Sequence, residues 1–287
     1  YSLWIYYRSI LMQGKKALKG SSQSSGGGVN IEDVFSTYLY TGNSSTQTIT
    51  NGIDLATDGG MVWSKQRSLA GDHLLTDTTR GTNSQLFTNG TWAQDTQTTA
   101  VTSFNSNGYT LGSYAASNGI TTSFASWTFK KQPRFFDMVK YTGNGVAGRE
   151  IAHNLGCDVG MIIIKPTSKI GNWIIWHNTL LSTSVMIFTT NGELTGYTTI
   201  FNSTTPSDAI ITLGDSILVN EDTEEYIAYL FAHDPLGESG DGSDGMIACG
   251  SFTTDGSGDA GLIWGGSRNT HYLNRHLIHK IGLSLIR

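Results

Sequence analysis

The sequence has little charge, little cysteine and little proline. Charged residues make up 14% of the chain and the net charge is −5, so it lacks the basic face that a nucleic-acid-binding protein needs. Two cysteines, Cys157 and Cys249, are too few for a disulfide scaffold. They are either two buried thiols or one bridge. Four prolines stand against 35 glycines and 10% aromatic residues, a composition that suits short strands joined by tight turns rather than a disordered chain.

Catalytic sequence motifs are also lacking. The chain contains neither the H-E-x-x-H sequence of zinc proteases nor the G-x-S-x-G sequence of serine hydrolases. Residues 143–148 and 240–245 match G-x-G-x-x-G, but strand-like residues follow each match, and a dinucleotide site needs a helix there. We interpret both as turns, and we predict that the protein is not an enzyme and binds no cofactor.

Two polar clusters leave metal binding open, although we assign no metal site. The loop residues Glu238, Asp241 and Asp244 could offer carboxylate oxygens to calcium, but they lack the order of an EF-hand. His271, His276 and His279 lie close together in sequence and could meet a metal ion. A solvated loop and a polar tail explain the two clusters equally well.

The first residues are apolar without resembling a membrane anchor. Residues 1–12 (YSLWIYYRSILM) include Arg8, are shorter than the roughly 20 residues of a membrane-spanning helix, and carry their charge inside the apolar run, unlike a secretory signal. We interpret residues 1–28 as a docking arm that ends in a Gly/Ser linker. The residues expected to contact a neighbouring protein are Leu3, Trp4, Ile5, Tyr6 and Tyr7.

An internal repeat is the strongest signal in the sequence. Tyr-Thr-Gly-Asn at residues 40–43 recurs at 141–144, Thr-Leu-Gly at 110–112 recurs at 212–214, and Pro133 recurs as Pro235. Because order and spacing are both kept, the chain contains a duplicated module of about 100 residues. The predicted divisions are the arm (1–28), a first β module (29–136), a second β module (137–236), and a partial third module with a divergent tail (237–287).

Each module has the pattern of many short strands. Apolar and polar residues alternate at positions 124–129, the period of a strand. Asn-Gly and Asp-Gly pairs, which favour hairpin turns, recur between the apolar runs, and no run of 12 residues has clear helical periodicity. The sequence therefore predicts an all-β fold of tandem jelly-roll-like or lectin-like β-sandwich modules with an extended N-terminal arm.

Aromatic residues in or beside polar stretches are candidate sugar contacts. A sugar site pairs an aromatic face with amide or carboxylate groups that bind hydroxyls. The alternative is that these residues fill the core, as the alignment of Trp173 with His73 suggests for part of the set. The candidates are Trp92, Tyr114, Trp173, Trp176 and Tyr197.

Several motifs carry a resemblance to a known family. Residues 33–42 (DVFSTYLYTG), residues 51–55 (NGIDL) with 60–63 (GMVW), residues 103–112 (SFNSNGYTLG) and residues 228–234 (AYLFAHD) resemble an uncharacterised repeat domain in structural proteins of cyanophages and other marine tailed phages. The resemblance covers roughly residues 29–264, and the sequence after Gly265 departs from it.

This resemblance implies a virion protein made in the host cytoplasm, most often a tail fibre or receptor-binding component that attaches to the host surface through a glycan. It also implies a homotrimer, with other virion proteins held through the N-terminal arm and with no membrane insertion. Two alternatives stay open. One is a capsid decoration or tail adaptor protein with no receptor role, and the other is a polysaccharide depolymerase.

Overall fold

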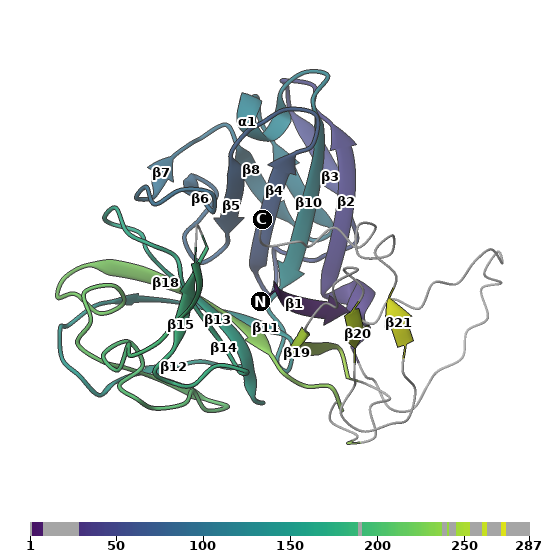
Figure 1. Ribbon diagram of the computed structural model, residues 1–287. Helices are drawn as coiled ribbons and strands as arrows, with labels where there is room; N and C mark the ends of the chain where they lie inside the picture. The colour runs from purple at the N-terminus through teal and green to yellow at the C-terminus, as the bar shows by residue number, and fades with distance from the viewer. Residues whose placement is uncertain are drawn as a thin grey trace.

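The computed structural model describes residues 2–7, 29–188, 191–236, 240, 245–252, 260–262 and 271–273. In these ranges the chain is almost entirely β, and its helices are the short η1 (Ile31–Asp33) and α1 (Ala115–Asn118) (Figure 1). The strands are β1 (Ser2–Tyr7), β2 (Phe35–Thr41), β3 (Gln47–Thr50), β4 (Gly60–Gln66), β5 (His73–Asp77), β6 (Ser84–Phe87), β7 (Asp95–Thr96), β8 (Val101–Asn105), β9 (Gly108–Leu111), β10 (Ser123–Lys130), β11 (Phe136–Thr142), β12 (Arg149–Ala152), β13 (Val159–Pro166), β14 (Ile174–His177), β15 (Val185–Ile187), β16 (Asn191–Leu194), β17 (Ile210–Leu213), β18 (Glu225–Ala232), β19 (Ile247–Phe252), β20 (Ala260–Leu262) and β21 (His271–Leu273).

The first module is a sandwich of two antiparallel sheets. A six-stranded sheet has the order β2-β10-β4-β5-β6-β7, and a three-stranded sheet has the order β3-β9-β8. Between them Tyr40, Ile49, Val62, Tyr109 and Phe124 form a buried cluster. Strand alternation turns Val62 of β4 and Phe124 of β10 into this cluster, and it turns Met61, Trp63 and Phe129 to the opposite face.

The second module repeats this arrangement. Its six-stranded sheet has the order β11-β18-β13-β14-β15-β16, and β12 pairs with β17 to form the facing sheet. The Tyr141 and Tyr226 rings stack at 5.3 Å, as the Tyr40 and Phe124 rings do at 5.0 Å in the first module. The predicted all-β sandwich is therefore confirmed. Strand β12 directly follows the glycine pattern at 143–148, which confirms that this pattern is a turn.

The repeated Tyr-Thr-Gly-Asn sequence folds over a buried asparagine. In the first module the Tyr40 hydroxyl donates to the Ser117 carbonyl at 2.7 Å. The Asn118 side chain accepts from the Asn43 backbone N–H at 2.9 Å and donates to the Gly112 carbonyl at 2.7 Å. Asn118 is fully buried, so it satisfies backbone groups that would otherwise be unpaired.

The second module has the same arrangement of a buried asparagine bound to backbone groups, which we call the asparagine lock. The Tyr141 hydroxyl donates to the Val219 carbonyl at 2.8 Å, and the Asn220 side chain accepts from the Asn144 N–H at 3.0 Å and donates to the Gly214 carbonyl at 2.7 Å. A Cβ at Gly143 would overlap the backbone of the segment that carries Asn220. The Tyr, Gly and Asn of the motif therefore recur because each of these three residues has a fixed contact.

The two modules pack through the outer faces of their six-stranded sheets. Phe129 of β10 and Phe231 of β18 meet edge to face at 5.5 Å, and residues of both modules, including Trp63 and Leu75, belong to one buried cluster. Figure 1 shows the first module above and to the right of the second, with the two in contact.

Four short strands of the described residues lie outside the two sandwiches. β1 pairs antiparallel with β19, and β20 pairs antiparallel with β21. Glu238, Asp241 and Asp244 of the candidate calcium loop lie outside the described residues, as do His276 and His279. In the part of the chain that the structure describes, no helix is long and apolar enough to cross a membrane.

Both cysteines are free thiols. Burial, together with the nearby charge of Asp234, raises the pKa of Cys157 to about 12, and burial raises the pKa of Cys249 further. Each thiol is therefore protonated at neutral pH, in the form that is a poor nucleophile.

Candidate functional site

The five candidate sugar-contact residues fall into two groups. Trp173 is 1% exposed and Trp176 is 2% exposed, so their rings face the core and cannot stack on a ligand from solvent. For these two residues the sugar-contact interpretation is corrected: the apolar strands around them draw the indoles inward. Trp92 is 52% exposed, and Tyr114 and Tyr197 are half-buried.

Trp92 lies on a loop whose backbone carbonyls accept hydrogen bonds from the buried Trp173 ring. The Trp173 Nε1 donates to the Gly90 carbonyl at 3.0 Å and to the Phe87 carbonyl at 3.2 Å. On the other side of this loop the Trp92 ring meets the Phe87 ring edge to face at 5.7 Å. A Cβ at Gly90 would overlap the Trp92 ring, so the exposed indole lies against bare backbone. Trp173 is thus a positioning residue for Trp92.

The same loop is fastened to the second module by its backbone. The Gly171 N–H donates to the Thr91 carbonyl at 2.8 Å, and the Gln94 N–H donates to the Thr167 carbonyl at 2.9 Å. The buried Lys165 ammonium also donates to the Thr91 carbonyl, at 3.4 Å. A loop held on both flanks presents its exposed aromatic ring with little loss of conformational entropy on binding.

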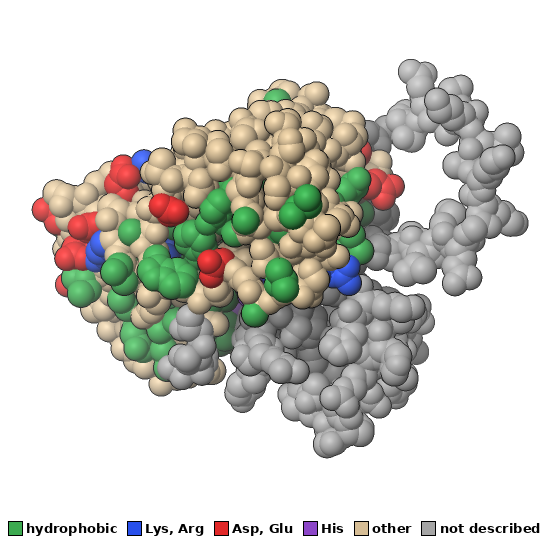
Figure 2. Space-filling model, turned by 90° about the horizontal axis from the view of Figure 1, so that it is seen from above, with side chains coloured by type: hydrophobic (Ala, Val, Ile, Leu, Met, Phe, Trp, Pro, Cys, Tyr) green, Lys and Arg blue, Asp and Glu red, His purple; other side chains and the backbone are tan. Residues whose placement is uncertain are grey.

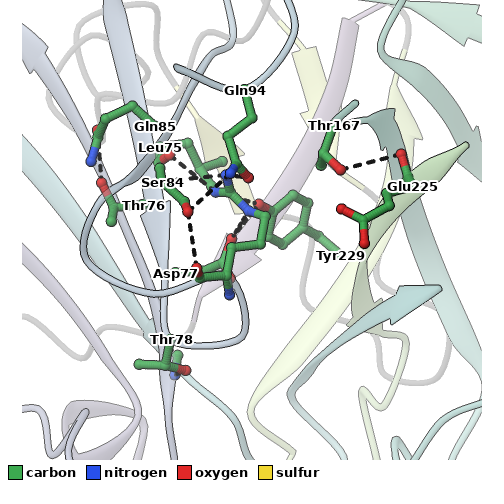
Figure 3. Close-up of polar contacts among 12 residues, drawn as sticks. Leu75, Thr76, Asp77, Thr78, Ser84, Gln85, Gln94, Thr167, Glu225 and Tyr229 are labelled. Carbon is green, nitrogen blue, oxygen red and sulfur yellow. Dashed lines mark hydrogen bonds and ion pairs between the residues drawn. The ribbon is translucent and has the colours of Figure 1, made fainter. Parts of the chain in front are cut away.

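A buried ion pair of the first module is hydrogen-bonded to a tyrosine of the second module. We call these three residues the Asp77–Arg80–Tyr229 network. Asp77 and Arg80 pair at 2.6 Å with side chains 0% and 1% exposed. The Tyr229 hydroxyl, from β18, donates to Asp77 at 2.7 Å and accepts from Arg80 at 3.2 Å. Figure 3 shows Tyr229 pointing from the second module toward Asp77 of the first.

Gln94 connects the network to the Trp92 loop. The Arg80 guanidinium donates to the Gln94 side-chain carbonyl at 3.1 Å, and the Gln94 amide donates to the Ser84 hydroxyl at 3.0 Å. Burial disfavours the charge on Arg80, but Tyr229 and Asp77 outweigh it and hold the pKa of the guanidinium above its ordinary value. Because its charged and hydroxyl groups are paired with one another across the two modules, the network fixes the relative position of the modules.

Asn89 and Asp95, each three positions from Trp92 in the sequence, belong to a polar group that also includes Asp72 and Tyr114. The Asn89 amide donates to the Asp72 carboxylate at 2.9 Å. Burial raises the pKa of Tyr114, and the charges of Asp95 and Asp72 raise it further, whereas a hydrogen bond with Gln97 opposes them. We call the whole set the Trp92 surface: Asp72, Asn89, Trp92, Asp95, Gln97 and Tyr114.

In the described part of the second module, no aromatic residue stands at the position of Trp92. The Gln97 N–H donates to the Asn83 carbonyl at 2.8 Å, and the Tyr197 N–H donates to the Thr183 carbonyl at 2.9 Å, so the two loops align at a spacing of 100 positions. This alignment places Gly192 where the first module has Trp92. Tyr197 thus holds the place of Gln97, and we no longer group it with Trp92.

Tyr114 is also specific to the first module. Its N–H donates to the Thr99 carbonyl at 3.0 Å, and the Ser216 N–H makes the matching bond to the Thr199 carbonyl at 3.1 Å. A serine therefore stands at the position of the tyrosine. Both aromatic residues of the Trp92 surface therefore differ from their counterparts in the second copy. Packing that the two modules share does not explain why they are aromatic.

The face seen in Figure 2 consists mostly of backbone and of side chains that are neither hydrophobic nor charged, with hydrophobic side chains in groups and charged side chains mainly toward the left end. Among the described residues, no group of three or more His, Cys, Asp or Glu side chains could hold a metal ion.

Sequence reasoning missed the partners of Trp92 and the network beneath it. Nothing in the sequence linked Asp77 to Tyr229, which are 152 positions apart. A comparison of the two copies could have found the surface, because Trp92 and Tyr114 stand at positions where the second copy has Gly192 and Ser216.

These features define a tandem β-sandwich protein whose two modules are locked face to face and whose first module carries an exposed aromatic loop. The chain belongs to the family described as "Domain of unknown function (DUF7483)", which matches residues 31–276. No curated protein and no solved structure matches the chain.

Proposed function

We propose that this chain is a structural virion protein of a tailed phage, acting as a tail fibre or other receptor-binding component, and that the Trp92 surface binds a host-surface glycan. The single observation that carries the glycan part is that Trp92 is exposed on a loop held by hydrogen bonds from the second module, at a position where the second copy has a glycine. The phage part is supported by the family resemblance of the repeated motifs.

The chemistry of the Trp92 surface suits a sugar. An indole face packs against the C–H face of a pyranose ring. Carboxylate groups accept hydrogen bonds from the sugar hydroxyls, and amide groups both accept from them and donate to them. Asp72 and Asn89 already orient each other at 2.9 Å, so they present fixed acceptors and donors. Preorganised groups of this kind lower the entropic cost of binding.

The rest of the protein serves as a rigid mount in this proposal. The Asp77–Arg80–Tyr229 network lies under the Trp92 loop and holds the modules together. Low charge and uncharged polar side chains suit a durable outer surface. We expect a homotrimer in the assembled virion, to which the protein is delivered after synthesis in the host cytoplasm, with other virion proteins as its neighbours.

Locating the protein in the virion tests the phage part of the proposal. Gold-labelled antibodies raised against the purified chain should mark the tail tip or fibres in electron micrographs. Label spread over the capsid lattice would overturn the receptor-binding role and favour a decoration protein. Loss of viscosity when the purified protein is mixed with host polysaccharide would instead indicate a depolymerase.

A further inference from the structure

In both modules the last strand in sequence pairs with the first strand of the six-stranded sheet. We call the last strand the closing strand and the first strand the opening strand. In the first module β10 pairs with β2, with Phe129 opposite Phe35. In the second, β18 pairs with β11, with Phe231 opposite Phe136. The closing strand is thus the last strand of its module, and it runs antiparallel to the first.

Strand β19 begins as β11 does. The Gln132 N–H, two residues beyond β10, donates to the carbonyl of Phe136, the first residue of β11, at 2.9 Å. The Asp234 N–H, two residues beyond β18, donates to the carbonyl of Ile247, the first residue of β19, also at 2.9 Å. β19 therefore follows the second module as β11 follows the first, and it occupies the place of an opening strand.

Strand β1 pairs with β19 in the register of a closing strand. Tyr7 lies opposite Ile247, as Phe231 lies opposite Phe136 and Phe129 opposite Phe35. The pairing continues without a shift to Ser2 opposite Phe252. A one-residue slip would exchange the two faces of the strand, so agreement of three registers is a specific geometric match.

We propose that β19 opens a third β module and that β1, from the same chain, is its closing strand. A distant segment near residue 1 thereby performs the task of β10 and β18. The hairpin of β20 and β21 follows β19 in the chain, as the β4–β5 and β13–β14 hairpins follow β2 and β11.

The sequence of β1 fits this role. Leu3, Ile5 and Tyr7 take the register positions that Ile227, Tyr229 and Phe231 hold in β18, and in the first module these positions belong to Ala125, Trp127 and Phe129. All three positions carry apolar or aromatic residues in every copy. In this proposal residues 3–7 pair with β19 of their own chain, whereas the apolar sequence had predicted that they contact a neighbouring protein.

A native cysteine allows the register to be tested in the full chain. Ile5 lies opposite Cys249, and directly opposed residues of antiparallel strands have Cα atoms roughly 4.5–5.5 Å apart, within disulfide reach. In a Cys157→Ser background, mild oxidation of Ile5→Cys should give a 5–249 disulfide within one chain, detected by mass spectrometry of non-reduced peptides. Tyr6→Cys, one residue out of register, is the matched control and should give none.

A second pair guards against a buried or unreactive Cys249. In a chain with Cys157→Ser and Cys249→Ser, Leu3→Cys with Ser251→Cys places two thiols opposite each other, whereas Leu3→Cys with Gly250→Cys does not. The proposal is overturned if neither matched pair cross-links, if matched and mismatched pairs cross-link equally, or if the disulfides join different chains.

Discussion

Phe129 contacts Phe231, the residue that holds the same position in the second module, with ring centroids 5.5 Å apart. A contact between counterpart residues is what an approximate two-fold relation between the modules would produce at that point. The surrounding contacts join residues that are not counterparts. Trp63 of the first module packs on Phe188 of the second at 6.2 Å, and Trp173 of the second binds the Phe87 carbonyl of the first. The two modules therefore meet in one continuous buried interface.

The Asp77–Arg80–Tyr229 network adds polar contacts to this interface, and its loss should be costly. Arg80→Met removes the cation and leaves the Asp77 carboxylate buried without a counter-charge. Breaking a buried pair in this way costs about 3–5 kcal/mol of unfolding free energy. Urea denaturation monitored by tryptophan fluorescence measures the loss.

Lys140→Met is the matched control for Arg80→Met. Lys140 pairs with Glu225 at 2.9 Å on the surface, and such exposed pairs contribute about 0–1 kcal/mol. Equal losses in the two variants would contradict the structural role of the network.

The buried asparagine of each module should matter more than its exposed neighbours in sequence. Asn118→Ala leaves the Gly112 carbonyl and the Asn43 N–H without partners, and each unpaired buried group costs about 1–3 kcal/mol. We expect a loss of about 2–4 kcal/mol. Asn107→Ala, at an exposed turn, should change stability by less than about 0.5 kcal/mol. A loss below 1 kcal/mol for Asn118→Ala would show that the lock is dispensable.

Acid should weaken the fold through His177. Burial and the nearby His233 lower the pKa of His177 to about 4, whereas an unfolded histidine titrates near 6.5. Between these values the unfolded chain binds a proton that the folded chain does not, so the free energy of unfolding falls as pH falls from about 6.5 to 4. The Nδ1 atom accepts from the Thr179 N–H at 3.2 Å, which fits the neutral ring.

Urea denaturation at a series of pH values checks this assignment. The contribution of His177 over the window is about 3 kcal/mol. His177→Gln should therefore have a flatter stability profile between pH 6.5 and 4, and His73→Gln, which alters a half-buried histidine, should keep most of the slope. An unchanged slope in His177→Gln would contradict the prediction.

The sequence was sufficient for the β class and for the repeat, because strand alternation and turn residues are local. The same locality let it propose Trp173 as a sugar contact, since polar neighbours in sequence say nothing of the apolar strands that bury the indole. The link from Tyr229 to Asp77 and the pairing of β1 with β19 depend on contacts between distant segments. No periodic pattern records such contacts, so they required the structure.

The glycan role of the Trp92 surface is tested most directly by host-cell adsorption and glycan-array binding of the assembled oligomer, comparing Trp92→Ala with Leu181→Ala. Leu181 is an exposed residue of the second module and serves as the control. Loss of an aromatic stacking partner worth about 1.5 kcal/mol lowers affinity about tenfold. The account predicts that loss for Trp92→Ala and wild-type binding for Leu181→Ala. Unchanged binding by Trp92→Ala, or no glycan binding by the wild-type oligomer, would contradict it.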